Sequence, residues 1–148
     1  MSRPNAEPIG LQLNRTAKRV SRAFDEALAA AGGSLPMWLV LVSLKGRPHG
    51  NQRDLASAAG IEGPTLTHHL NRMEAAGLLQ RSRDPDNRRE HRVQLSAAGE
   101  ALFLQLRAAV IAFDRRLRDG IQADELSVLS GLLERLRNNV GEAAEEGR

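Results

Sequence analysis

The chain has 148 residues, of which 41% are hydrophobic and 26% charged, proportions typical of one globular domain that is long enough to bury a core. It contains no cysteine, which excludes disulfides, thiolate metal sites and thiol redox sensing. The net charge of +3 only weakly favours an anionic partner. The N-terminus shows no signal-peptide pattern and no apolar run reaches the length of a membrane span, so we expect a cytoplasmic protein with no membrane partner.

Two helices are predicted in the first third of the chain. Apolar residues at steps of three and four predict a long helix over residues 9–31. The paired glycines at 32–33 end this helix. Ser34 is placed to cap a second helix, which continues through Trp38 to Leu44.

Two short helices follow, with a glycine between them. Asn51 is the candidate N-cap of the first, over residues 52–59, and Gly60 ends it. The second covers residues 64–76 and is closed by Gly77. Two short helices joined by a glycine-containing turn are typical of a helix-turn-helix.

The hydrophobic period then changes from helical to alternating. Residues 78–83 and 90–95 predict two strands, and the Asp-Pro-Asp-Asn run at 84–87 predicts a tight turn between them. A hairpin with a charged tip, directly after the second helix of the pair, is typical of the wing of a winged helix-turn-helix.

Two helices are expected in the remaining chain. Ser96 caps the first, which runs to about residue 118, and the last runs from about residue 124 to Val140 with an apolar seam at steps of three and four. Because further apolar residues, such as Leu132, lie off this seam, we interpret the first helix and the last two as a homodimer interface across a two-fold axis. The alternative is packing within one chain.

The predicted fold is mostly α with a small β wing, in a single domain over residues 1–148. Residues 47–97 form the winged helix-turn-helix lobe of that domain. The predicted dimerisation helices cover residues 9–31 and 97–141.

The order of these elements, with four characteristic sequence runs, resembles the MarR family of transcription regulators and, within it, the SlyA-like branch. The resemblance extends from about Pro8 to Val140, and its most specific runs are residues 60–66, 73–79, 84–89 and 93–99. It implies a homodimer that binds a palindromic operator in double-stranded DNA and represses transcription until a small aromatic or phenolic anion relieves it. Such a regulator would be cytoplasmic, and nucleoid-associated when bound to DNA.

Four other functions are alternatives to this interpretation. The wing arginines and the acid-free face of the second helix of the pair disfavour a winged helix that contacts only another protein. A family member that activates transcription or displaces a silencing protein is one alternative, and a metal-responsive regulator is another. Four histidines are present, but they form no spaced ligand cluster and no cysteine joins them, so neither a metal nor a cofactor is expected. An enzyme is disfavoured because the sequence has no phosphate loop, nucleophile elbow or His-Glu-x-x-His pair.

The second helix of the pair is the candidate recognition helix, since the major groove of B-DNA admits one helix. Its polar face has no acidic residue before Glu74, and its side chains can donate to phosphates or base edges or contact a thymine methyl. The alternative is a polar surface helix that binds nothing. The resemblance places an arginine at the base-reading position that is His68 here. The candidate DNA-binding residues are Pro64, Thr65, Thr67, His68, Asn71 and Arg72.

The wing supplies a second set of candidate DNA contacts. The resemblance implies that Arg88 enters the minor groove and that Asp86 helps to hold it, with Arg83 and Arg89 nearby. A narrow A·T-rich minor groove attracts arginine through its enhanced negative potential. The alternative is a solvated, salt-bridged hairpin tip.

The resemblance also implies a crevice for a small aromatic acid. Arg15 and Lys18, about one turn apart on the first helix, align with the cations that meet the carboxylate, and Trp38 aligns with a tryptophan that packs on the ring. Val42 replaces a polar residue of that pocket. The alternative is that Trp38 belongs to the core and that both cations face solvent or DNA. A ligand would act by favouring a dimer whose recognition helices are wrongly spaced for DNA.

Arg88→Ala should weaken operator binding strongly and leave the fold intact, because the wing arginine would contact DNA and not the core. Gel-shift titration measures the first effect and thermal unfolding the second. An unchanged DNA affinity would show that the wing assignment is wrong.

Overall fold

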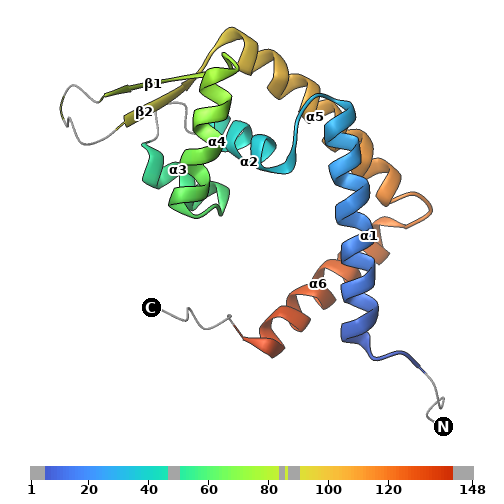
Figure 1. The fold of residues 1–148 in the computed structure, drawn as a ribbon. Helices are drawn as coiled ribbons and strands as arrows, with labels where there is room; N and C mark the ends of the chain where they lie inside the picture. Colours follow the sequence, from blue (N-terminus) through green and yellow to red (C-terminus); the bar gives the residue numbers. More distant parts are fainter. Residues whose placement is uncertain (1–5, 47–50, 84–85, 87–90, 142–148) are drawn as a thin grey trace. The chain divides into compact units, whose positions relative to one another are not determined.

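The computed structural model describes residues 6–46, 51–83, 86 and 91–141 (Figure 1). The predicted order of six helices and two strands is confirmed in this part of the chain, and the ends of the elements differ from the predicted ones by one or two residues. The elements are α1 (Ile9–Ala30), α2 (Leu35–Gly46), α3 (Gln52–Ala59), α4 (Gly63–Ala75), β1 (Leu79–Arg83), β2 (His91–Leu95), α5 (Ala97–Leu117) and α6 (Ala123–Val140).

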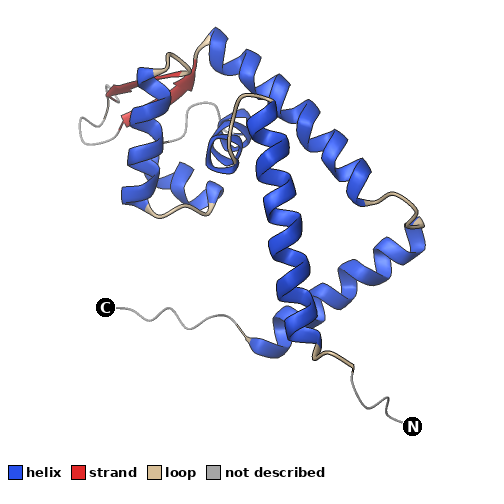
Figure 2. Cartoon of the chain, turned by 45° about the vertical axis from the view of Figure 1, so that its right-hand side comes forward, coloured by secondary structure: helices blue, strands red, loops and turns tan. Residues whose placement is uncertain are grey.

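The chain forms two compact units, Met1–Phe113 and Asp114–Arg148. The first contains α1 to α4, the wing strands and most of α5, and the second contains α6. Figure 2 shows the two strands of the first unit in red beside its helices. They form an antiparallel pair in which Leu79 lies opposite Leu95 and Arg83 opposite His91.

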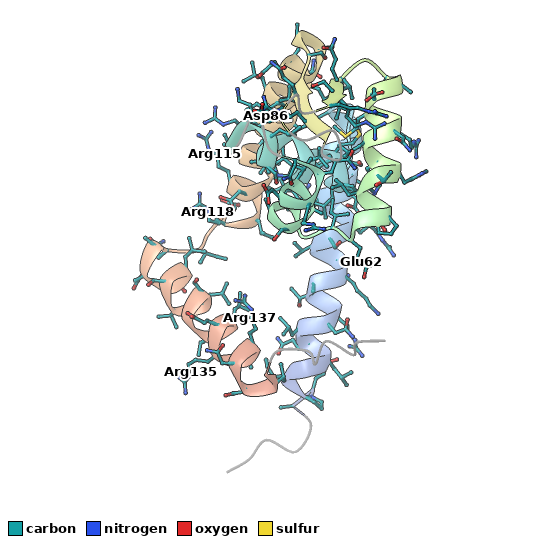
Figure 3. All side chains as sticks on the ribbon, turned by 90° about the vertical axis from the view of Figure 1, so that its left-hand side faces the viewer. Glu62, Asp86, Arg115, Arg118, Arg135 and Arg137 are labelled. Atoms are coloured by element: carbon teal, nitrogen blue, oxygen red, sulfur yellow. The ribbon has the colours of Figure 1, made fainter. Side chains whose placement is uncertain are left out.

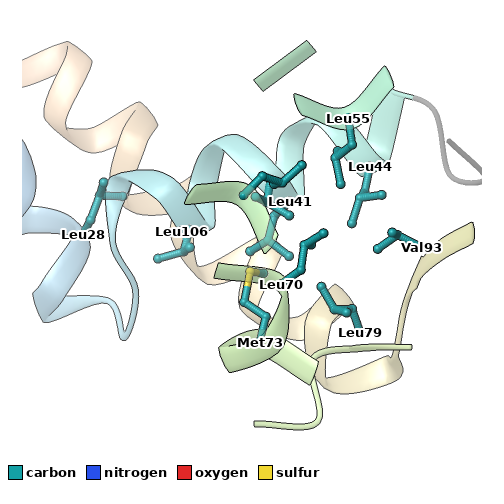
Figure 4. Close-up of a cluster of buried hydrophobic side chains, with 11 residues drawn as sticks. Leu28, Leu41, Leu44, Leu55, Leu70, Met73, Leu79, Val93 and Leu106 are labelled. Atoms are coloured by element: carbon teal, nitrogen blue, oxygen red, sulfur yellow. The ribbon is translucent and has the colours of Figure 1, made fainter. Parts of the chain in front are cut away.

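A cluster of buried aliphatic side chains holds the first unit together (Figure 4). Helix α2 is apolar on all sides, as expected of a helix at the centre of a domain, and its Val40, Leu41 and Leu44 are fully or almost fully buried. No polar or charged residue is buried in the described part of the chain. Every other element of the unit contributes to the cluster through Leu28, Leu55, Leu66, Leu70, Met73, Leu79, Val93 and Leu106.

No single helix in the described part of the chain is long and apolar enough to cross a membrane. By length and composition alone, α1 and α2 meet that criterion only as a pair, which is bent by 73°.

The caps that end and begin the helices follow the sequence prediction. The Asn51 side chain accepts a hydrogen bond from the backbone N–H of Asp54 over 2.8 Å, which caps α3. Gly60 and Gly77 end α3 and α4 with φ of +67° and +75°, a conformation that costs glycine little. At Gly77 the backbone bond from Leu78 to the Met73 carbonyl, 3.0 Å long, completes a Schellman turn.

A close contact at the start of α5 joins that helix to the wing. The Ser96 hydroxyl donates to the Gly77 carbonyl over 2.6 Å, and the backbone N–H of Gly99 donates to the same hydroxyl over 3.1 Å. A Cβ placed on Gly99 would lie 2.0 Å from the Leu78 carbonyl oxygen, well inside van der Waals contact. Only glycine therefore fits at this position without moving the backbone.

Gly99→Ala should destabilise the protein by about 1–3 kcal/mol or more, because backbone atoms cannot yield as a flexible side chain can. The free energy of unfolding by urea checks this. Gly10→Ala in α1, where a Cβ would meet nothing within 4 Å, is the matched control and should cause no loss. Equal stability of the two variants would contradict the close contact.

Candidate DNA-binding interface

Helix α4 has one face in the core and one in solvent. Leu66, Leu70 and Met73 are buried, at steps of four and three residues. The exposed surface of the helix carries all six predicted DNA contacts: Pro64, Thr65, Thr67, His68, Asn71 and Arg72. The structure therefore presents these side chains together, on a helix whose orientation is set by the core.

Two of the six are engaged by hydrogen bonds within the protein. The Thr67 hydroxyl donates to the Gly63 carbonyl over 3.0 Å, so its proton is turned back to the helix and its oxygen remains as an acceptor. The Asn71 side-chain oxygen accepts from the Arg81 guanidinium over 2.5 Å. The sequence predicted both side chains as donors to DNA. The structure uses the hydroxyl proton of Thr67, whereas at Asn71 it uses the oxygen and leaves the NH₂ donors.

The start of α4 has a backbone cap only. Glu62, labelled in Figure 3, occupies the N-cap position and makes no side-chain cap. Its backbone carbonyl accepts a hydrogen bond from the N–H of Leu66 over 2.8 Å. Pro64 lies in the first turn, where the missing N–H of proline costs no hydrogen bond.

The two consecutive histidines occupy different environments. The rings of His68 and His69 lie 5.7 Å apart, at 61° to one another. His68 is exposed at the predicted base-reading position, while His69 is half-buried. His69 faces a cavity of about 460 Å³ between the start of α2 and α4, which is lined by Ser34, Pro36, Met37, His69, Arg72, Met73, Ala76 and Leu78.

The described part of the wing contains only two of its four predicted contact residues. Arg83 is exposed at the end of β1, and Asp86 is exposed in the turn region. Arg88 and Arg89 lie outside the described residues. The minor-groove contact therefore stays a prediction.

The four predicted ligand residues lie outside the linings of the two cavities described for this part of the chain, and their role stays a prediction. Arg15 is exposed and pairs with Glu7 over 2.8 Å, and Lys18 is exposed. Trp38 stacks on Phe103 of α5, with ring centroids 5.6 Å apart and planes at 8°. Val42 is partly exposed. One face of the Trp38 ring is thus already covered from within the chain.

Sequence reasoning missed Arg81, which is held by α4. Its Nε donates to Glu74 Oε2 over 2.7 Å, and its Nη2 donates to Asn71. The sequence gives little indication of these contacts, because an arginine in a predicted strand is expected to face solvent. Only the packing of β1 beside α4 shows that it is satisfied internally.

The metal-responsive alternative concerns the histidine and acidic side chains of the described residues. These residues contain no group of three histidine, cysteine, aspartate or glutamate side chains that could hold a metal ion.

Comparison with known proteins identifies the same lobe. Residues 34–91 match the model of the MarR family. A probable transcriptional regulator from Pseudomonas aeruginosa is 30% identical, with a TM-score of 0.75, over 88% of this chain and 98% of that one.

Two further structures share the fold across most of their length. The transcriptional repressor CouR, solved bound to a 23-mer DNA duplex, is 28% identical with a TM-score of 0.78, over 87% of this chain and 92% of that one. BpsR of Bordetella bronchiseptica is 24% identical with a TM-score of 0.75, over 88% and 98% respectively. The match to the family model runs from the start of α2 to the first residue of β2. Together with the regulator that is 30% identical over 98% of its length, it shows that the chain belongs to the MarR family of DNA-binding transcription regulators.

Proposed function

We propose that the protein is a homodimeric repressor, of the SlyA-like branch, that binds an inverted-repeat operator with α4 in the major groove and the wing in the adjacent minor groove. The observation that supports this most is the exposed polar face of α4, which is free of acidic residues from Gly63 to Met73. A phosphate-lined groove repels carboxylates, so such a face suits DNA better than it suits solvent alone.

The apolar surface of α6 supports the dimer. No residue of α6 is buried in the single chain. The exposed fractions of its Leu129, Leu132 and Leu133 are 46%, 47% and 38%. Exposed leucines in such numbers on one helix indicate an interface. Ile9, Leu11 and Leu13 of α1 add to the exposed apolar surface of the monomer. A two-fold dimer would bring two recognition helices to two half-sites roughly one helical turn apart.

Leu129→Glu should convert the dimer to a monomer and abolish the operator footprint, since a buried charge at the apolar seam has no partner. Sedimentation equilibrium measures the mass, and footprinting on duplexes selected from random DNA measures the site. The wild-type protein should protect two half-sites related by a dyad.

Ser127→Glu, which adds the same charge off the seam of α6, is the control and should remain a dimer. A monomeric wild-type protein, or protection of a single asymmetric half-site, would refute the proposed dimer.

We further propose that a small aromatic carboxylate regulates DNA binding from the cavity between α2 and α4. BpsR, which shares the fold, is regulated in its DNA binding by 6-hydroxynicotinic acid. In the present chain the cavity combines an apolar wall, which includes Met37 and Met73, with His69 and Arg72. This combination fits an aromatic ring with an anionic group. Arg72 is also a candidate DNA contact, so ligand and DNA would compete for it.

Salicylate, used as the probe, should raise the Tm of the free protein, because a ligand that binds the folded state stabilises it. It should weaken the DNA affinity, because it favours the conformation that does not bind DNA. Ala76→Leu narrows the cavity and should remove both effects. Arg15→Gln with Lys18→Gln should leave both in place.

If Ala76→Leu keeps both effects of salicylate and Arg15→Gln with Lys18→Gln removes them, the ligand binds at the cations of the first helix that the sequence suggested. If salicylate changes neither the Tm nor the DNA affinity of the wild-type protein, regulation by this class of ligand is refuted.

A further inference from the structure

The guanidinium of Arg81 joins the first wing strand to the recognition helix. It binds Asn71 and Glu74, which lie three residues apart and therefore on the same face of α4. The Arg81 side chain is 19% exposed and that of Glu74 is 42% exposed. A carboxylate thus balances the charge of Arg81, and most of the side chain is withdrawn from solvent, so it is poorly placed to bind a phosphate itself.

This contact determines which end of the Asn71 amide faces the guanidinium. A guanidinium has donors only, so the group that meets it must be the amide oxygen and not the amide nitrogen. The contact is also charge-assisted, which makes it stronger than a neutral hydrogen bond. In the described residues no acceptor is bonded to the amide nitrogen of Asn71, and that NH₂ group is the end left for another molecule.

We propose that Arg81 is a positioning residue that fixes Asn71 as a hydrogen-bond donor toward DNA. The inference rests on the proposed role of α4 as the recognition helix. An unrestrained asparagine reads adenine with both ends of its amide, donating to N7 and accepting from the N6 amino group. Here Arg81 already takes one of the two lone pairs of that oxygen and fixes the plane of the amide, whereas the described residues leave the NH₂ group without an acceptor. Asn71 instead suits an acceptor on DNA, either a base edge or a phosphate oxygen.

The arrangement also links the two elements that contact DNA. Arg81 belongs to β1, at the register position opposite Val93, whereas Asn71 belongs to α4. A side chain from the wing therefore sets the hydrogen-bonding pattern of a side chain on the recognition helix. A change in the wing at Arg81 should consequently alter DNA recognition through Asn71.

A double-mutant cycle tests this coupling. Wild type, Asn71→Ala, Arg81→Met and the double variant are compared by fluorescence anisotropy on a duplex selected by the wild-type protein from random DNA. Each single variant should bind about tenfold more weakly, as for the loss of one specific contact. The double variant should be no more than about twofold weaker than Asn71→Ala, because Arg81 acts through Asn71.

Three controls separate this role from others. Gln80→Met, at the exposed neighbouring position in β1, should bind like wild type. The slope of log affinity against log salt should be the same for Arg81→Met and wild type. Thermal unfolding shows whether each variant is folded. If Arg81→Met unfolds, Arg81→Lys replaces it, because lysine keeps the charge but cannot bind Asn71 and Glu74 with a planar guanidinium.

Two results would overturn the proposal. An equal loss from Arg81→Met in the wild-type and Asn71→Ala backgrounds would show that Arg81 only supports the fold. A salt slope smaller by about one would show that Arg81 contacts a phosphate directly.

Asn71→Asp tests the donor itself, since it keeps the oxygen for Arg81 and removes the NH₂ group. It should lose DNA affinity without loss of Tm, and binding as tight as wild type would refute a donor at this position. A loss confined to the selected duplex indicates a base-edge acceptor, and an equal loss on unrelated duplexes indicates a phosphate. A wild-type protein that binds no duplex would refute the proposed function, independently of Asn71.

Discussion

The burial of one face of α4 against the aliphatic core is the constraint on which the proposed DNA-binding surface depends. Leu66, Leu70 and Met73 can pack on the central helix α2 only if the opposite face of α4 points outward. Since α2 is apolar on all sides, it packs against several elements at once, and its Val40, Leu41 and Leu44 are buried among them. The outward face of α4, which is the proposed recognition surface, is therefore held in place by the packing beneath it, as a helix that must match a groove of fixed width requires.

The positions of individual charged side chains matter more to this surface than the net charge of the chain. The chain is rich in arginine, yet its net charge is only +3, and several arginines are paired within the protein. Arg15 pairs with Glu7, Arg81 with Glu74, and Arg118 with Asp114. In Figure 3 Arg115 and Arg118 lie near the end of α5, and Arg135 and Arg137 lie on α6. A count of basic residues consequently overstates the number available to DNA, and a few exposed side chains on α4 and in the wing carry the proposed interaction.

The cavity between α2 and α4 gives the recognition helix two surfaces with different chemistry. The solvent-facing surface of α4 presents His68 and Asn71, while His69, Arg72 and Met73 of the same helix line the cavity. A ligand in the cavity would therefore touch the same helix that is proposed to read DNA. Such a site needs no long-range transmission, because one rigid helix would carry the effect from ligand to DNA.

The sequence by itself determined the elements and their order, because each depends on local chemistry. Periodicity located the helices, Asn51, Gly60 and Gly77 marked their ends, and the alternation after Gly77 identified the wing. It also identified the outward residues of α4, since these are what remains when the buried stripe is removed. Tertiary structure alone decided the partners of those residues. Arg81 is ten residues from Asn71, and Trp38 is far from Phe103 in the chain, so no local pattern links them. These contacts exist because the core brings β1 beside α4 and α5 beside α2, and the contact of Arg81 determines which end of the Asn71 amide is open.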